Sequence, residues 1–114
     1  MKNTIKQLLR ENFVFDNKDF AKNRLAGAEK IIANAKEKGG DAMLTYNHFN
    51  VKPKYYKKAI NGNFNIKQAI TEFNETYKKI STDMTQTEFQ KEVGRLEVLG
   101  ELIIKNKNGK NIRP

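Results

Sequence analysis

The stretch NIKQAITEFNETYKKI, residues 65–80, carries the clearest helical pattern in the chain. Asn65 precedes the first apolar residue, and an asparagine there can accept a hydrogen bond from a free backbone N–H of the first helical turn. Apolar side chains then recur at intervals of three and four, which places them on one face of an α-helix. We therefore expect an amphipathic helix on which one stripe is formed by Ile66, Ala69, Ile70, Phe73, Tyr77 and Ile80.

The same spacing recurs on both sides of this stretch, with punctuation between the segments. Gly39-Gly40 ends one long apolar-periodic segment, because glycine tolerates the left-handed conformation that follows a helix. Thr85 and Glu88 fit a capping box that opens another. The pattern predicts a short helix over residues 3–13, a long one to about Lys38, short ones over 42–49 and 54–60, and one from Thr85 to near Gly100.

The last residues have a different character. Leu102-Ile103-Ile104 is β-prone, and Asn108-Gly109 favours a tight turn into a return strand over 111–113. The alternative is a basic tail, because an isolated hairpin is only marginally stable in water. The expected fold is mainly α, a compact five- to six-helix single domain over residues 1–114, with a helical body (1–101) and a basic hairpin or tail (102–114).

The positive charge is concentrated in two segments. The chain has 114 residues, no cysteine and a formal net charge of +9. Residues 42–71 contain no acid and five lysines, and residues 102–114 contain no acid and four bases, which together equal the whole net charge. Clustered positive charge raises the local concentration of anions. The alternative is a basic face that only confers solubility.

Residues 46–58, YNHFNVKPKYYKK, combine four aromatic residues with four lysines and no acid. Lysines can neutralise phosphates, and exposed tyrosine rings can stack on unpaired bases. The alternative is that Tyr46, Phe49 and one of the adjacent pair Tyr55 and Tyr56 belong to the core. Adjacent residues point to different sides of a helix, so at least one of that pair is expected to be partly exposed.

Nothing in the sequence indicates an enzyme. His48 is the single histidine and has no evident catalytic partner, so packing against its aromatic neighbours is the simpler interpretation. The pairs Glu72/Glu75 and Glu88/Glu92 are typical of solvated helix surfaces. With no cysteine, no phosphate-binding loop and no long apolar run, we expect no metal site, no cofactor and no membrane span.

Residues 85–100, TQTEFQKEVGRLEVLG, followed by Leu102-Ile103-Ile104 and a basic Asn-Gly turn, resemble the recognition helix and wing of winged-helix DNA-binding domains. The resemblance implies that the helix would face DNA and that Lys105, Lys107 and Lys110 would form the wing. It departs from the family in its acidic residues and its truncated second wing strand. The helix residues that it would place against DNA are Gln86, Gln90, Lys91, Gly94 and Arg95.

Residues 5–11, IKQLLRE, and 39–49, GGDAMLTYNHF, resemble small proteins of tailed bacteriophages with AT-rich genomes. That resemblance implies no established activity. It adds a virion or packaging component, or an inhibitor of a host nucleoprotein, to the possible roles, in the host cytoplasm or the virion. For a chain with no targeting signal, the cytoplasm is the default expectation.

These observations predict a non-catalytic basic protein that binds nucleic acid, DNA or RNA, mainly through phosphates. The rival hypothesis is a structural or interaction protein that docks on an acidic protein surface. Oligomeric state is left open. The candidate nucleic-acid-binding residues are Lys52, Lys54, Tyr55, Tyr56, Lys57, Lys58, Lys67, Lys91, Arg95, Lys105, Lys107, Lys110 and Arg113.

Overall fold

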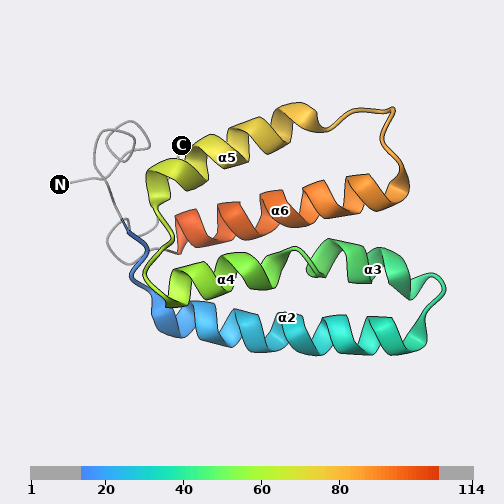
Figure 1. The fold of residues 1–114 in the computed structure, drawn as a ribbon, viewed down its shortest axis with the longest axis horizontal. Coiled ribbons are helices and arrows are strands. Elements are labelled where there is room, and N and C mark those ends of the chain that lie inside the picture. The colour runs from blue at the N-terminus through green and yellow to red at the C-terminus, as the bar shows by residue number, and fades with distance from the viewer. Residues whose placement is uncertain (1–13, 106–114) are drawn as a thin grey trace.

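The computed structural model describes residues 14–105, which are helical apart from short connections (Figure 1). Helices α3 and α4 are separated only by Asn50 and Val51 and follow one another along one rod. The described chain is thus built of four helical rods. The helix bounds are α2 (Lys18–Lys38), α3 (Ala42–Phe49), α4 (Lys52–Ile60), α5 (Ile66–Lys79) and α6 (Gln86–Ile104).

The rods lie side by side in the order α2, α3–α4, α6 and α5 (Figure 1). Helix α2 packs against both α3 and α4, while α6 packs against α3, α4 and α5. The resulting compact domain is a slab of 49 × 33 × 20 Å. The first residues of α2 and α5 and the last residues of α4 and α6 meet at one end of it.

The core lies along the central rods. The buried residues of α2 are Ala21, Ala28 and Ala35, which are spaced seven residues apart and form one narrow stripe of small side chains. This stripe allows α2 to approach α3 and α4 closely. The largest fully buried side chains belong to the other elements, and they are Phe15, Tyr55, Ile66, Val98, Leu99 and Leu102.

The expected helix signals are confirmed where the structure describes them. The side chain of Asn65 accepts a hydrogen bond from the Gln68 backbone N–H at 3.0 Å. Thr85 and Glu88 form the full capping box at the start of α6. Gly39 has a φ of +64° and ends α2 by donating its N–H to the Ala35 carbonyl. Local sequence therefore determines where these helices begin and end.

The expected C-terminal hairpin is wrong for its first strand. Leu102, Ile103 and Ile104 continue α6 by one further turn rather than forming a β-strand. Leu102 and Ile103 lie four residues after Val98 and Leu99, and this helical spacing buries all four side chains in the core. That burial outweighs the β preference of isoleucine, a preference that depends strongly on context.

The expected number of five to six helices is likewise not borne out, because α3 and α4 share one rod. The expected helix over residues 3–13 and the expected return strand over 111–113 lie outside the described residues. Within residues 14–105, no helix is long and apolar enough to cross a membrane.

Candidate nucleic-acid interface

Helix α4 has two faces of opposite character. Its buried residues are Lys52, Tyr55, Tyr56 and Ala59. Lys54, Lys57 and Lys58 are exposed, and their spacing of three and four places them together on the outer face. The candidate residues of α4 therefore divide into an inner group and an outer group.

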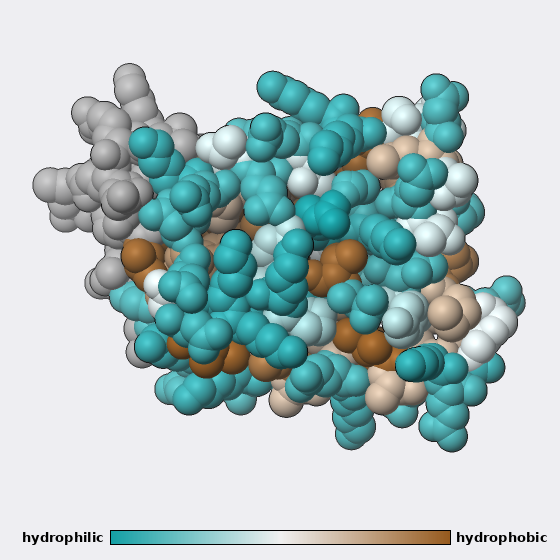
Figure 2. All heavy atoms as spheres, viewed as in Figure 1, coloured by the Kyte–Doolittle hydropathy of each residue, from teal (hydrophilic) through white to brown (hydrophobic). Residues whose placement is uncertain are grey.

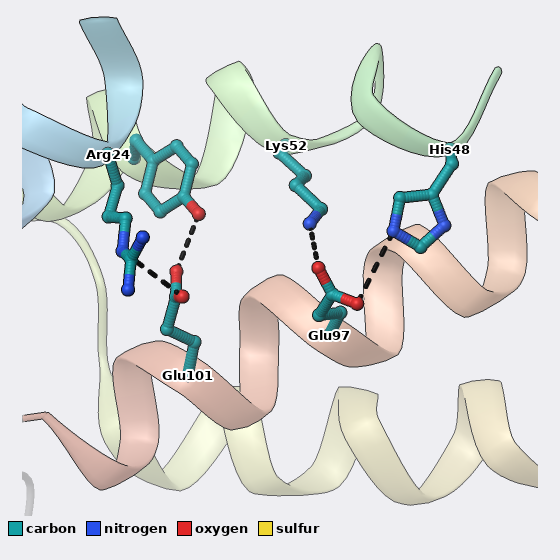
Figure 3. Close-up of polar contacts among 6 residues, drawn as sticks. Arg24, His48, Lys52, Glu97 and Glu101 are labelled. Atoms are coloured by element: carbon teal, nitrogen blue, oxygen red, sulfur yellow. Dashed lines mark hydrogen bonds and ion pairs between the residues drawn. The ribbon is translucent and has the colours of Figure 1, made fainter. Parts of the chain in front are cut away.

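Lys52 belongs to the inner group and does not face solvent. Its side chain is only 4% exposed, and its Nζ forms an ion pair with Glu97 of α6 (Figure 3). The ammonium group also lies 4.3 Å from the centre of the Phe49 ring. His48 approaches the same carboxylate, with its Nε2 3.4 Å from Oε2. This pairing makes Lys52 a structural residue rather than a free phosphate ligand.

These neighbours change the acidity of Glu97. Partial burial alone would raise the pKa of its carboxyl group, but the hydrogen bond and positive charge of Lys52, together with His48, lower that pKa below its usual value. Glu97 is therefore held as a carboxylate that joins α6 to the junction of α3 and α4 (Figure 3).

Tyr55 and Tyr56 are both buried, 1% and 3% exposed, so the expectation that at least one would reach solvent is wrong. The Tyr55 hydroxyl donates to Glu72 of α5, and the Tyr56 hydroxyl donates to Glu101 of α6 at 2.6 Å. Two adjacent side chains can both be buried because α4 has neighbours on two sides. Neither ring is available for base stacking.

Burial also changes the acidity of these tyrosines. Loss of solvation, followed by the hydrogen bond to the Glu72 carboxylate, raises the pKa of Tyr55 to about 12. Burial and Glu101 raise the pKa of Tyr56 as well. The second oxygen of Glu101 lies 3.3 Å from Nε of Arg24 on α2, so this carboxylate links three helices (Figure 3).

The candidate residues of α6 also divide. Lys91 is exposed, whereas Arg95 is half-buried and binds both oxygens of Glu92 one turn earlier. Gly94 lies directly against the carbonyl group of His48, so this side of α6 packs on the α3–α4 junction. Gly94 and Arg95, which the winged-helix resemblance would place against DNA, are both occupied by contacts within the domain.

Four glutamates have partners within the domain. Glu72, Glu92, Glu97 and Glu101 bind, respectively, a tyrosine, an arginine, a lysine with a histidine, and a tyrosine with an arginine. By contrast, Lys54, Lys57 and Lys58 take part in no ion pair formed among residues 14–105. These four acids are thus engaged by side chains of the domain, whereas the outer lysines of α4 are exposed.

The loop after α4 brings a further lysine close. The Asn63 backbone N–H donates to the Lys58 carbonyl at 2.9 Å, which folds residues 61–65 back over the end of α4. Helix α5 begins directly after this loop, and Lys67 is exposed in its first turn. Lys67 therefore lies at the same end of the domain as Lys57 and Lys58.

A second set of hydrogen bonds brings the other acid-free segment to this end. The Phe15 N–H donates to the Phe64 carbonyl at 2.9 Å, and these two rings meet edge to face. Two residues further on, Asn17 donates from Nδ2 to the carbonyl of Lys105 at 2.8 Å. The exposed Lys105 consequently lies beside the loop that joins α4 to α5, whereas Lys107, Lys110 and Arg113 are outside the described residues.

We call Lys54, Lys57, Lys58, Lys67 and Lys105 the basic surface. All five are exposed, and none pairs with an acid within residues 14–105. Lys18, exposed in the first turn of α2 next to Asn17, lies at the same end. Lys18 lies outside both acid-free segments, because Asp16 and Asp19 flank it in sequence.

A shallow cavity of about 320 Å³ opens beside the basic surface, between α4, α5 and α6. Its charged lining residues are Lys54, Lys79, Arg95, Glu72 and Glu75. Lys54 of the basic surface therefore borders a cavity whose lining carries both signs of charge. Among the described residues, no group of three or more acidic or histidine side chains is placed to hold a metal ion.

Hydrophilic residues cover most of the molecular face drawn in Figure 2, and hydrophobic residues show only as separate patches. No protein-family model, no curated protein and no solved structure matches this chain.

Proposed function

We propose that this protein is a non-catalytic basic domain that binds nucleic acid through its phosphates at the basic surface. One observation carries the proposal. Two acid-free segments meet at one end of the domain, and their exposed lysines have no carboxylate partner within residues 14–105, while four glutamates are bound by other side chains. Phosphate groups would supply the missing counter-charge.

The expected binding is electrostatic and depends on salt. Each lysine that neutralises a phosphate releases condensed counterions, and log K falls with log salt by about 0.9 per contact on duplex DNA. Five contacts from the basic surface give an expected slope of about −4.5. A measured slope shallower than about −2 would contradict binding through these phosphates.

The test is a charge reversal on the outer face of α4, Lys54→Glu with Lys57→Glu and Lys58→Glu. These side chains are exposed, so we expect unchanged helicity by circular dichroism. Affinity for a fluorescent oligonucleotide at 0.1 M salt should fall by about 10²- to 10³-fold, because three contacts are lost and replaced by repulsion.

The matched control applies the same charge change to α2, Lys30→Glu with Lys36→Glu and Lys38→Glu. These lysines are exposed and lie in the second half of α2, whose first residues lie at the end of the domain that carries the basic surface. Their reversal alters the net charge equally, but it removes no proposed contact, so the affinity should fall by less than about tenfold. Equal losses in the two triple variants would show that net charge, and not the basic surface, determines binding.

An acidic protein partner would use the same lysines and is the rival hypothesis. It predicts a stable protein complex on a sizing column and only weak binding to oligonucleotides. Our proposal instead predicts that the purified protein carries material that absorbs at 260 nm and is removed by nuclease.

A further inference from the structure

We infer that the basic surface binds double-stranded nucleic acid in preference to single-stranded, through phosphate contacts without base stacking. This inference rests on the proposed function and specifies its ligand. Single-strand binders generally combine a basic groove with aromatic side chains, on which successive bases stack. A preference for single strands would therefore require an accessible aromatic ring at the basic surface.

The rings nearest to the basic surface are enclosed. Tyr55 and Tyr56 lie on the inner face of α4, and their hydroxyl groups are bound by glutamates of α5 and α6. Phe64, in the loop that leads to Lys67, is 4% exposed and packs on Phe15. Rotating a tyrosine outward would break its hydrogen bond and open the core, so these rings are not available for stacking on bases.

The exposed aromatic rings are elsewhere. Tyr77 is 67% exposed in the last turn of α5, and Phe89 is 39% exposed in the first turn of α6. Both lie near the connection between α5 and α6, away from the loop between α4 and α5 (Figure 1). Outside residues 14–105 the sequence has a single aromatic residue, Phe13.

Within residues 14–105, both arginines are also occupied. Arginine binds guanine with two hydrogen bonds, but Arg24 is paired with Glu101 and Arg95 with Glu92. The basic surface itself presents lysines. Contacts of this kind fix a protein on the backbone without distinguishing sequences, so the relevant property of the ligand is its charge density.

The charge density of the duplex sets the size of the preference. The salt exponent is about 0.9 per contact for duplex DNA and about 0.7 for a single strand. For five contacts, the duplex and single-strand salt exponents therefore differ by about one. If the two affinities converge near 1 M salt, this difference makes duplex binding about tenfold tighter at 0.1 M salt. Stacking at the basic surface would reverse this order.

The experiment measures fluorescence anisotropy of the full chain with a 20-base-pair duplex and with one of its strands, from 0.05 to 0.3 M salt. We expect about tenfold tighter duplex binding at 0.1 M, slopes near −4.5 and −3.5, and equal affinity for a duplex of scrambled sequence. Equal or tighter binding of the single strand would overturn the inference and leave the proposed function intact. Binding to neither probe would refute both.

Tyr77→Ala provides a control against stacking elsewhere on the molecule. Because this ring lies away from the basic surface, the substitution should leave both affinities unchanged within about twofold. A selective loss of single-strand affinity would show that Tyr77 stacks on bases, and the inference would then be wrong.

Discussion

Helices α3 and α4 lie end to end in one rod, yet the helix with the more apolar sequence is the less buried of the two. Five of the eight residues of α3, AMLTYNHF, are apolar, but none of its residues is buried. Four of the nine residues of α4, KPKYYKKAI, are lysines, but four of its residues are buried, Lys52 among them. Composition alone would have placed α3 in the core and α4 at the surface.

The difference shows that neighbours determine burial here. Helix α4 is enclosed by α2, by α6 and by Glu72 of α5, so its inner face is covered on two sides. Helix α3 contacts α2 and α6 but leaves Met43 and Leu44 38% and 41% exposed. The function proposed for α4 follows from this arrangement, because the enclosed inner face fixes the helix and leaves three lysines on the outside.

The junction of the two helices should be the most sensitive place to break this arrangement. A Cβ atom at Gly94 would overlap the carbonyl oxygen of His48 and lie 2.9 Å from its carbon. Backbone atoms on both sides would have to move, so Gly94→Ala should lower the free energy of unfolding by about 3 kcal/mol. Urea denaturation measures this loss.

Gly27→Ala is the matched control, because Gly27 is also helical and nothing lies within 4 Å of its added Cβ. Alanine is the better helix former, so this variant should gain about 0.5–1 kcal/mol. A similar loss in both variants would mean that the contact at Gly94 is not what holds α6 against the α3–α4 junction.

The second-largest loss of stability is expected on substitution of Lys52, and Lys54, two residues later in α4, serves as its control. Lys52→Met keeps the length of the side chain but removes the ion pair, and we expect a loss of about 1–2 kcal/mol. This is less than the ~3–5 kcal/mol typical of a broken buried pair, because the Glu97 side chain is 54% exposed and can be hydrated. Lys54→Met, on the outer face, should change stability by less than about 0.5 kcal/mol.

The pH dependence sharpens this prediction. The pKa of Glu97 is lowered in the folded state, so its contribution to stability is present above its unfolded pKa and is lost as the pH falls through the folded one. The difference between wild type and Lys52→Met should therefore narrow on acidification from pH 6 to pH 3. A constant difference would mean that Lys52 stabilises α4 by packing on Phe49 rather than by pairing with Glu97.

A smaller effect is expected at Tyr55. Tyr55→Phe removes the hydroxyl that binds Glu72 and should cost about 1 kcal/mol at pH 7. Because the folded pKa is raised from 10.0 to about 12, the tyrosine contributes stability that is complete below pH 10 and is lost between pH 10 and about 12. The variant should lack this alkaline component in urea denaturation, whereas Tyr77→Phe, at an exposed ring, should retain it.

The parts of the fold that sequence predicts are those set by local interactions. The Asn65 cap, the Thr85 capping box and the glycine that ends α2 are each decided within a few residues. The continuation of α6 through Ile104 is not decided locally, because it depends on core contacts that the β-prone tripeptide itself does not reveal.

The same distinction applies to the candidate site. Charge patterning singled out Lys54, Lys57, Lys58, Lys67 and Lys105, all of which are exposed. It could not exclude Lys52, because the partner carboxylate Glu97 is 45 residues away in sequence. Nor could it show that both tyrosines of α4 are buried, because the pattern of one helix does not reveal how many neighbours it will have.

The smallest effect is expected in α3, and it tests whether the exposed apolar side chains of this helix contribute little to stability. Met43→Gln replaces an apolar side chain that is 38% exposed, and it should change the urea midpoint by the equivalent of less than about 0.5 kcal/mol. In α4, Ala59→Gln would force a long polar side chain into a site that is fully buried and should be strongly destabilising. If Met43→Gln were instead costly, Met43 would be covered by a part of the chain outside residues 14–105 or by another molecule. The low burial of α3 within residues 14–105 would then result from the absence of that covering part, and not from a position of α3 at the protein surface.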